Sequence, residues 1–112
     1  MKSELGDKQR LQHISQACTN ILKSTDGFNE ESFFDHFIVN AAVCYFITII
    51  GEATANLSKE FKERHIEFNW KAIKGMRNII VHKYFGVDYA RVWFTVQNHI
   101  PKLKTDCENA IK

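Results

Sequence analysis

The stretch FIVNAAVCYFITII, residues 37–50, is the most apolar run in this 112-residue sequence. It is shorter than the roughly 20 residues that a helix needs to span a bilayer, and Gly51 and Glu52 close it. The apolar pattern extends at helical spacing from about Asp35 to Leu57. The run therefore predicts the central core helix of the protein, and we expect it to be the least exposed helix.

Shorter apolar stripes, each with an N-capping residue in front of it, predict helices on both sides of this central helix. They are expected from Asp7 (the N-cap) to Lys23, from Asn29, from Ser58, from Trp70 (capped by Asn69) to about Tyr84, and from Asp88 onward. Pro101 lacks an amide hydrogen, so we expect an interruption in the last of these helices. Because no linker or repeat divides the chain, the sequence predicts one all-α domain over residues 1–112, a compact bundle of four to five main helices.

The composition is that of a folded, mildly basic protein, with 45% hydrophobic residues, 25% charged residues and a formal net charge of +2. This charge permits contact with RNA or another polyanion without requiring it. Cys18, Cys44 and Cys107 form no CxxC pair and are expected to be thiols in a reducing cytosol. The N-terminus lacks the apolar core of a signal peptide, and no His/Cys or carboxylate cluster has ligand spacing. We therefore expect a cytoplasmic protein with no membrane contact, metal or other cofactor.

The segment GMRNIIVHKYFG, residues 75–86, mixes four polar side chains with apolar ones. In a regular helix Asn78 and His82 lie about 40° apart and Arg77 and Tyr84 about 20° apart. Arg77 and His82, however, diverge by about 140°, which is too far for both to touch one phosphate from an isolated helix. Either the helix loosens at its end or a second chain brings its own copy alongside, so the geometry predicts a homodimer with both motifs facing one groove.

The chemistry of these side chains suits RNA cleavage. The imidazole of His82 can accept the proton of a ribose 2′-hydroxyl or supply one to the leaving oxygen. The guanidinium of Arg77 can hold a phosphate through two donors and oppose the charge that builds on it. The spacing alone also fits a solvent-exposed polar face, which is the simpler interpretation because Arg and His are common on one helix.

Other polar and aromatic residues near the segment have weaker signals. Lys71, Lys74 and Lys83 surround it and could guide an RNA backbone, although exposed lysines are ordinary. Trp70 and Trp93 are expected to anchor the core in preference to stacking on bases.

The segment RNIIVHKYFGVD, residues 77–88, resembles the signature of the HEPN superfamily, in which an Arg and a polar residue precede a His. Its His-x-Tyr ending resembles the HepT-like branch. Further matches extend over nearly the whole chain and comprise IIGEATANLS at 49–58, Trp70, GMRN at 75–78, YFGVD at 84–88 and Val92-Trp93.

The resemblance implies a dimeric helical bundle that acts as a metal-independent endoribonuclease, the toxin of a prokaryotic toxin–antitoxin pair. It implies RNA as the substrate, with no DNA expected, and a minimal nucleotidyltransferase as the antitoxin. Arg77 and His82 would be catalytic, Asn78 a supporting polar group, and Tyr84 the acceptor of AMP from the antitoxin. An AMP group on Tyr84 would crowd the cleft and repel an RNA phosphate.

One stretch departs from the family pattern. Members often place an Arg and other polar residues upstream of the Gly-Glu pair, where this sequence has Cys44-Tyr45-Phe46. Glu52 matches the pattern, and we expect it either to orient Arg77 or to remain a solvent-exposed side chain. The departure motivates an alternative function, a non-catalytic helical module that docks a nucleotidyltransferase, a nucleotide or RNA.

Overall fold

The computed structural model describes residues 4–81 and 86–112, and over these ranges the chain forms helices and no strand. The helices are α1 (Glu4–Ser24), α2 (Glu30–Asp35), α3 (Phe37–Ala55), α4 (Lys59–Arg64), α5 (Trp70–Val81), α6 (Tyr89–Asn98) and α7 (Ile100–Ile111). Five of them have ten residues or more, so the predicted all-α bundle is confirmed.

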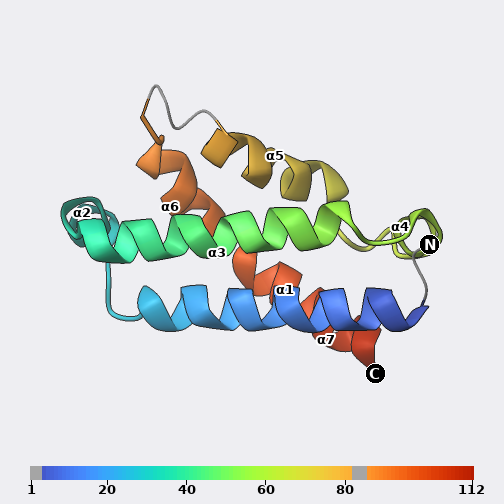
Figure 1. The fold of residues 1–112 in the computed structure, drawn as a ribbon. Helices are drawn as coiled ribbons and strands as arrows, with labels where there is room; N and C mark the ends of the chain where they lie inside the picture. Colours follow the sequence, from blue (N-terminus) through green and yellow to red (C-terminus); the bar gives the residue numbers. More distant parts are fainter. Residues whose placement is uncertain (1–3, 82–85) are drawn as a thin grey trace.

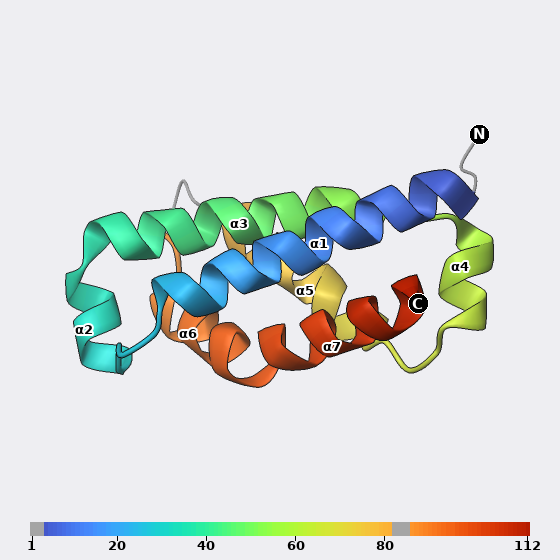
Figure 2. The same ribbon diagram turned by 90° about the horizontal axis from the view of Figure 1, so that it is seen from below.

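Helices α1 and α3 run antiparallel and side by side, with α2 joining them at one end and α4 lying at the other (Figure 1). Helix α7 packs along α1 (Figure 2), while α5 lies on the side of α3 that faces away from α1. Between these helices lies the core, which includes most of the stripes predicted for the first and last helices: Leu11, Ile14, Cys18, Ile21, Val92, Val96, Ile100 and Leu103. Leu22 and Trp93, also predicted in these stripes, are partly buried against it. The arrangement leaves α5 on the outside of the bundle, packed against α3 and α6.

Helix starts predicted from capping residues are confirmed. The side chains of Asn29, Ser58, Asn69 and Asp88 each accept a hydrogen bond from the backbone N–H three residues later, at 2.8–3.3 Å. The predicted interruption near Pro101 is also confirmed, because α6 ends before His99 and α7 begins after it. These features depend on residues close in sequence, which is why a local pattern reveals them.

Asp7 has a different role from the predicted N-cap. Helix α1 begins at Glu4, so Asp7 lies inside it, and its buried carboxylate accepts hydrogen bonds from the backbone N–H (2.8 Å) and the hydroxyl (2.6 Å) of Ser58. Ser58 in turn caps α4 by accepting from the N–H of Phe61 at 3.1 Å. Asp7 therefore ties α1 to the start of α4, and the prediction that it caps its own helix is wrong.

Helix α3 is buried on one side only, so the prediction that it is the least exposed helix is wrong. Val43, Ile47 and Ile50 are fully buried, whereas Phe37, Ile38 and Tyr45 have relative exposures of 75%, 63% and 63%. We call the exposed side chains of Phe37, Ile38, Ala41 and Tyr45 the α3 apolar face.

Within the described residues, α3 is also the one helix long and apolar enough to cross a membrane, a weak criterion that the core helices of bundles also meet. Its buried side packs on α1 and α5, as in a core helix.

The three cysteines are free thiols, two of them fully buried. Burial raises the pKa of Cys18 to about 12 and also raises the pKa values of Cys107 and Cys44. At neutral pH these groups are therefore neutral thiols and weak nucleophiles, in accord with the expectation of structural cysteines.

Replacing Asp7 with Ala is expected to destabilise the fold by about 1–3 kcal/mol, because the buried N–H of Ser58 then loses its acceptor. Urea denaturation measures the change. Asp26→Ala, which removes an exposed carboxylate in the turn after α1, should stay within about 0.5 kcal/mol of the wild type. Equal effects of the two substitutions would show that the contact between α1 and α4 contributes nothing to the free energy of unfolding.

Candidate functional site

Helix α5 carries Arg77 and fixes its direction through a buried stripe on the adjacent side of the helix. Ile73, Met76 and Ile79 recur every three residues and are 5%, 1% and 7% exposed. The helical angle of about 100° per residue places Ile73 and Ile79 on either side of Met76, and Arg77 on the polar side. Ile79 therefore belongs to the core.

Helices α5 and α3 approach each other closely at Gly51. A Cβ atom added to this buried glycine would lie 3.3 Å from both Cβ and Cγ of Arg77, tighter than most contacts of real Cβ atoms. The missing side chain thus lets the stem of Arg77 lie against the backbone of α3. This contact explains in physical terms why a glycine stands at this position of the central helix.

Glu52, the next residue of α3, pairs with the head of the same arginine. Its Oε1 lies 3.5 Å from Nη2 of Arg77, and the two side chains are 60% and 51% exposed. An exposed ion pair of this length contributes little stability, but it can orient the guanidinium. Glu52 thus lies beside Arg77 and is also solvent-exposed, so both expected roles stay open, and the remaining donors of the guanidinium can still reach an anion.

A pocket of about 350 Å³ opens beside Arg77, between α3, α4 and α5. Its lining residues are Gly51, Thr54, Ala55, Lys62, Trp70, Ile73, Lys74 and Arg77. We call it the basic pocket, because its charged residues are all cationic. Lys74 was expected near the motif from the sequence, whereas Lys62 was not singled out because it belongs to a mixed-charge helix that looks like an ordinary solvent-exposed surface.

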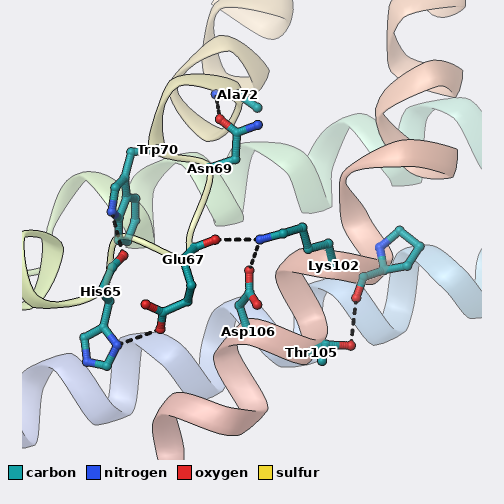
Figure 3. A network of polar contacts seen from close by, with 9 residues as sticks. His65, Glu67, Asn69, Trp70, Ala72, Lys102, Thr105 and Asp106 are labelled. Atoms are coloured by element: carbon teal, nitrogen blue, oxygen red, sulfur yellow. Dashed lines mark hydrogen bonds and ion pairs between the residues drawn. The ribbon is translucent and has the colours of Figure 1, made fainter.

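Trp70 forms a fixed wall of the basic pocket. Its Nε1–H donates to the carbonyl of His65 at 3.0 Å (Figure 3), and its ring stacks on Phe68 with centroids 4.8 Å apart. The predicted role of Trp70 as a packing residue agrees with these contacts.

Contacts from α7 hold the loop that leads into α5 (Figure 3). The ammonium group of Lys102 donates to the carbonyl of Glu67 and to the carboxylate of Asp106, both at 2.6 Å. The Glu67 carboxylate also lies 2.8 Å from Nδ1 of His65, and this hydrogen bond lowers the pKa of Glu67. No sequence motif predicted the bond from Lys102 to Glu67, because it joins the loop to a helix about 35 residues later.

The structure thus brings Glu52, Lys74 and Arg77 together, with Asn78 exposed on the next position of α5. His82, Lys83 and Tyr84 lie outside the described residues. Among the residues that are described, no group of three or more His, Cys, Asp or Glu side chains could hold a metal ion. The described part of the site is therefore an oriented guanidinium beside a cationic pocket.

Comparison with known proteins places this site in a family. The family model described as "Ribonuclease HepT-like" matches residues 14–110, which include the whole of the site. The chain belongs to the HepT-like ribonuclease family. This assignment confirms the resemblance drawn from residues 77–88 and the expectation of a ribonuclease.

Several relatives support the assignment over nearly their whole length. "Putative RNase TTE0752" of Caldanaerobacter subterraneus is 37% identical over 102 residues, 91% of each chain. "Probable ribonuclease HepT" of Thermococcus cleftensis is 35% identical over 109 residues, 94% of this HepT-like chain and 96% of the relative. "Putative RNase MJ1380" of Methanocaldococcus jannaschii is 33% identical over 101 residues, 90% and 93% of the two chains. No solved structure gave a significant match.

Gly51→Ala and Gly75→Ala are expected to have different effects on stability. Each substitution gains up to about 1 kcal/mol of helix propensity, and a Cβ at Gly75 would meet nothing within 4 Å. At Gly51 the added Cβ pushes on Arg77, so this variant should be less stable than Gly75→Ala by about 1 kcal/mol or more. Urea denaturation compares the two variants, and equal stabilisation would contradict the close approach at Gly51.

Proposed function

We propose that this HepT-like ribonuclease is a metal-independent endoribonuclease and the toxin of a toxin–antitoxin pair. The observation that carries the proposal is the exposed guanidinium of Arg77, oriented by Glu52 at the edge of the basic pocket, within the motif of a ribonuclease family. Arg77 and His82 are the catalytic residues, Asn78 is a supporting polar group, and Glu52 is a positioning residue.

The proposed reaction uses the 2′-hydroxyl of RNA as the nucleophile. His82 accepts the 2′-hydroxyl proton as the 2′-oxygen attacks the adjacent phosphorus, and the bond to the 5′-oxygen breaks. The departing 5′-oxygen receives a proton from the protonated imidazole of His82. The products are a 2′,3′-cyclic phosphate and a free 5′-hydroxyl. Arg77 neutralises the additional negative charge on the phosphoryl oxygens in the transition state.

The α3 apolar face supports the predicted homodimer. Phe37, Ala41, Tyr45 and Thr48 are all exposed, and at about 100° per residue they fall on the same side of α3 as Glu52. A second copy seated on this side would cover the apolar groups and come next to the ion pair of Glu52 with Arg77. The two motifs would then face one groove, which is one of the two ways in which Arg77 and His82 could meet at a single phosphate.

The departure at residues 44–46 fits the same proposal. Tyr45 is exposed on the α3 apolar face, while Cys44 and Phe46 are half-buried. An aromatic side chain at this position supplies apolar contact area between two copies. Polar side chains at residues 44–46 in relatives would instead leave more water between the two copies.

The proposed antitoxin is a minimal nucleotidyltransferase that transfers AMP to Tyr84. Each AMP group adds a negatively charged phosphate two residues from His82 in sequence. The adduct would occupy the cleft and compete for the same cations as the RNA backbone. We place the pair in the cytoplasm, with no membrane or DNA as a partner.

Replacing either catalytic residue is expected to abolish toxicity and to lower RNA cleavage by about 10²-fold or more, because proton transfer and charge neutralisation are lost. His82→Ala and Arg77→Ala are compared with the wild type for growth after induction in a bacterium, and for cleavage of purified RNA in excess EDTA. Arg91→Ala removes an exposed cation on α6 and should leave both readouts unchanged.

Wild-type protein that folds but cleaves no RNA would overturn the nuclease proposal. Binding of the nucleotidyltransferase by the same inactive protein would favour the alternative of a non-catalytic docking module. Mass spectrometry after co-expression with the transferase tests the modification, which should be found on Tyr84 and be absent from Tyr84→Phe.

Breaking the α3 apolar face is expected to produce monomers. Phe37→Glu places a charge where the second copy would sit, while Phe37 is so exposed in the single chain that the fold should tolerate the change. Light scattering should report a dimer for the wild type and for Ile66→Glu, a control at an apolar residue that is 83% exposed in the loop before α5. A monomeric wild type, or a Phe37→Glu variant that stays dimeric, would contradict this interface.

A further inference from the structure

We propose that the basic pocket is a phosphate subsite, in which Lys62 and Lys74 hold the RNA phosphodiester next to the one that Arg77 contacts. The inference rests on the proposed ribonuclease function and extends it to the path of the substrate. It assigns a role to Lys62, a residue of the short helix α4 that lies 15 positions before Arg77 in the sequence.

The charge of the pocket is concentrated relative to the chain. Lys62, Lys74 and Arg77 are the charged residues of the lining, and Glu52 offsets the charge of Arg77 alone, so the two lysines give the pocket its excess of positive charge. Cations gathered in one concave site attract a polyanion more strongly than the same cations spread over the surface. The charge of the pocket therefore suits it to bind a nucleic acid backbone.

The cations come from two directions. Lys74 and Arg77 are three residues apart on α5, hence about 60° apart around the helix and about 4.5 Å apart along it. Lys62 belongs to α4 and lines the same pocket. An anion in the pocket can thus be held from two helices, while Arg77 at the edge remains available for the adjacent phosphate.

The neutral polar groups of the pocket already have partners. The hydroxyl of Thr54 donates to the carbonyl of Gly51 at 3.1 Å, and Nε1–H of Trp70 donates to the carbonyl of His65 at 3.0 Å. The other polar side chains of the lining are cationic, and their charge favours a phosphate over a base that needs specific hydrogen bonds.

The aromatic wall also argues against base stacking in the pocket. Phe68 lies parallel to Trp70, with an angle of 7° between the rings, so one face of the indole is already covered. The loop bearing Phe68, which leads into α5, is held by Lys102 from α7. Trp70 is thus a fixed apolar boundary of the pocket.

The experiment measures binding apart from cleavage, with a labelled 2′-O-methyl oligoribonucleotide that lacks the nucleophilic hydroxyl. Lys62→Gln and Lys74→Gln should each lower the slope of log affinity against log salt concentration by about 0.7 and weaken binding about fivefold at 0.1 M salt. Lys59→Gln removes an exposed lysine three residues before Lys62 on the same helix, outside this pocket, and should behave as the wild type. Lys62→Arg and Lys74→Arg keep the charge and should retain the wild-type slope.

A second measurement, of KM and kcat, distinguishes substrate binding from the chemical step. On cleavable RNA the Lys62→Gln and Lys74→Gln variants should have a raised KM and a nearly unchanged kcat, because a contact to the adjacent phosphate is the same before and during the reaction. Arg77→Ala should instead lower kcat.

The outcomes distinguish this inference from the ribonuclease proposal. RNA cleavage by the wild type, combined with pocket variants whose salt slopes match those of the control variants, would overturn the subsite alone. Salt slopes that depend on Lys62 and Lys74 in a protein that cleaves nothing would uphold the subsite and overturn the nuclease. Absence of any binding by the wild type would overturn the subsite as well. Should Lys62→Gln fail to fold, Lys74→Gln decides the question by itself.

Discussion

The contact between Gly51 and Arg77 is the constraint on which the candidate site depends. Because α3 carries no side chain at this point, α5 can lie close enough for the arginine stem to rest on its backbone. Glu52 then meets the guanidinium one residue later, and the small residues Thr54 and Ala55, one turn further along α3, leave the space that becomes the basic pocket. A single row of small side chains thus sets the helix spacing, the direction of the arginine and the volume beside it.

Helix α3 serves two sides of the molecule, and this double use explains why its exposure was mispredicted. A helix that is apolar all round is normally buried all round, so the sequence favoured a fully enclosed core helix. In one chain, Val43, Ile47 and Ile50 pack inward while Phe37, Ile38 and Tyr45 remain exposed. Composition records how much apolar surface must be covered, but it does not say whether the cover comes from the same chain or from a second copy.

The parts that could be predicted from the sequence are those governed by short-range geometry. Four N-caps were identified because each cap joins a side chain to a backbone group three residues away. The role of Asp7 was missed because its partner, Ser58, lies 51 residues away in sequence. Lys62 was overlooked for the same reason, since its proximity to Arg77 arises only when α4 and α5 fold onto α3. The candidate catalytic residues came from a family motif, whereas their spacing alone favoured a solvent-exposed helix face.

The weakness of the ion pair between Glu52 and Arg77 is what suits it to a substrate site. A buried pair would lose its solvation on folding and would hold the guanidinium tightly, so that an incoming phosphate would have to break a costly contact. Here both side chains are half-exposed and 3.5 Å apart, so water screens their attraction and little free energy is lost when the arginine turns to a phosphate. The carboxylate still favours one direction for the free side chain, which lowers the entropy lost on binding. Orientation without strong retention is therefore the property that this pair gives to Arg77.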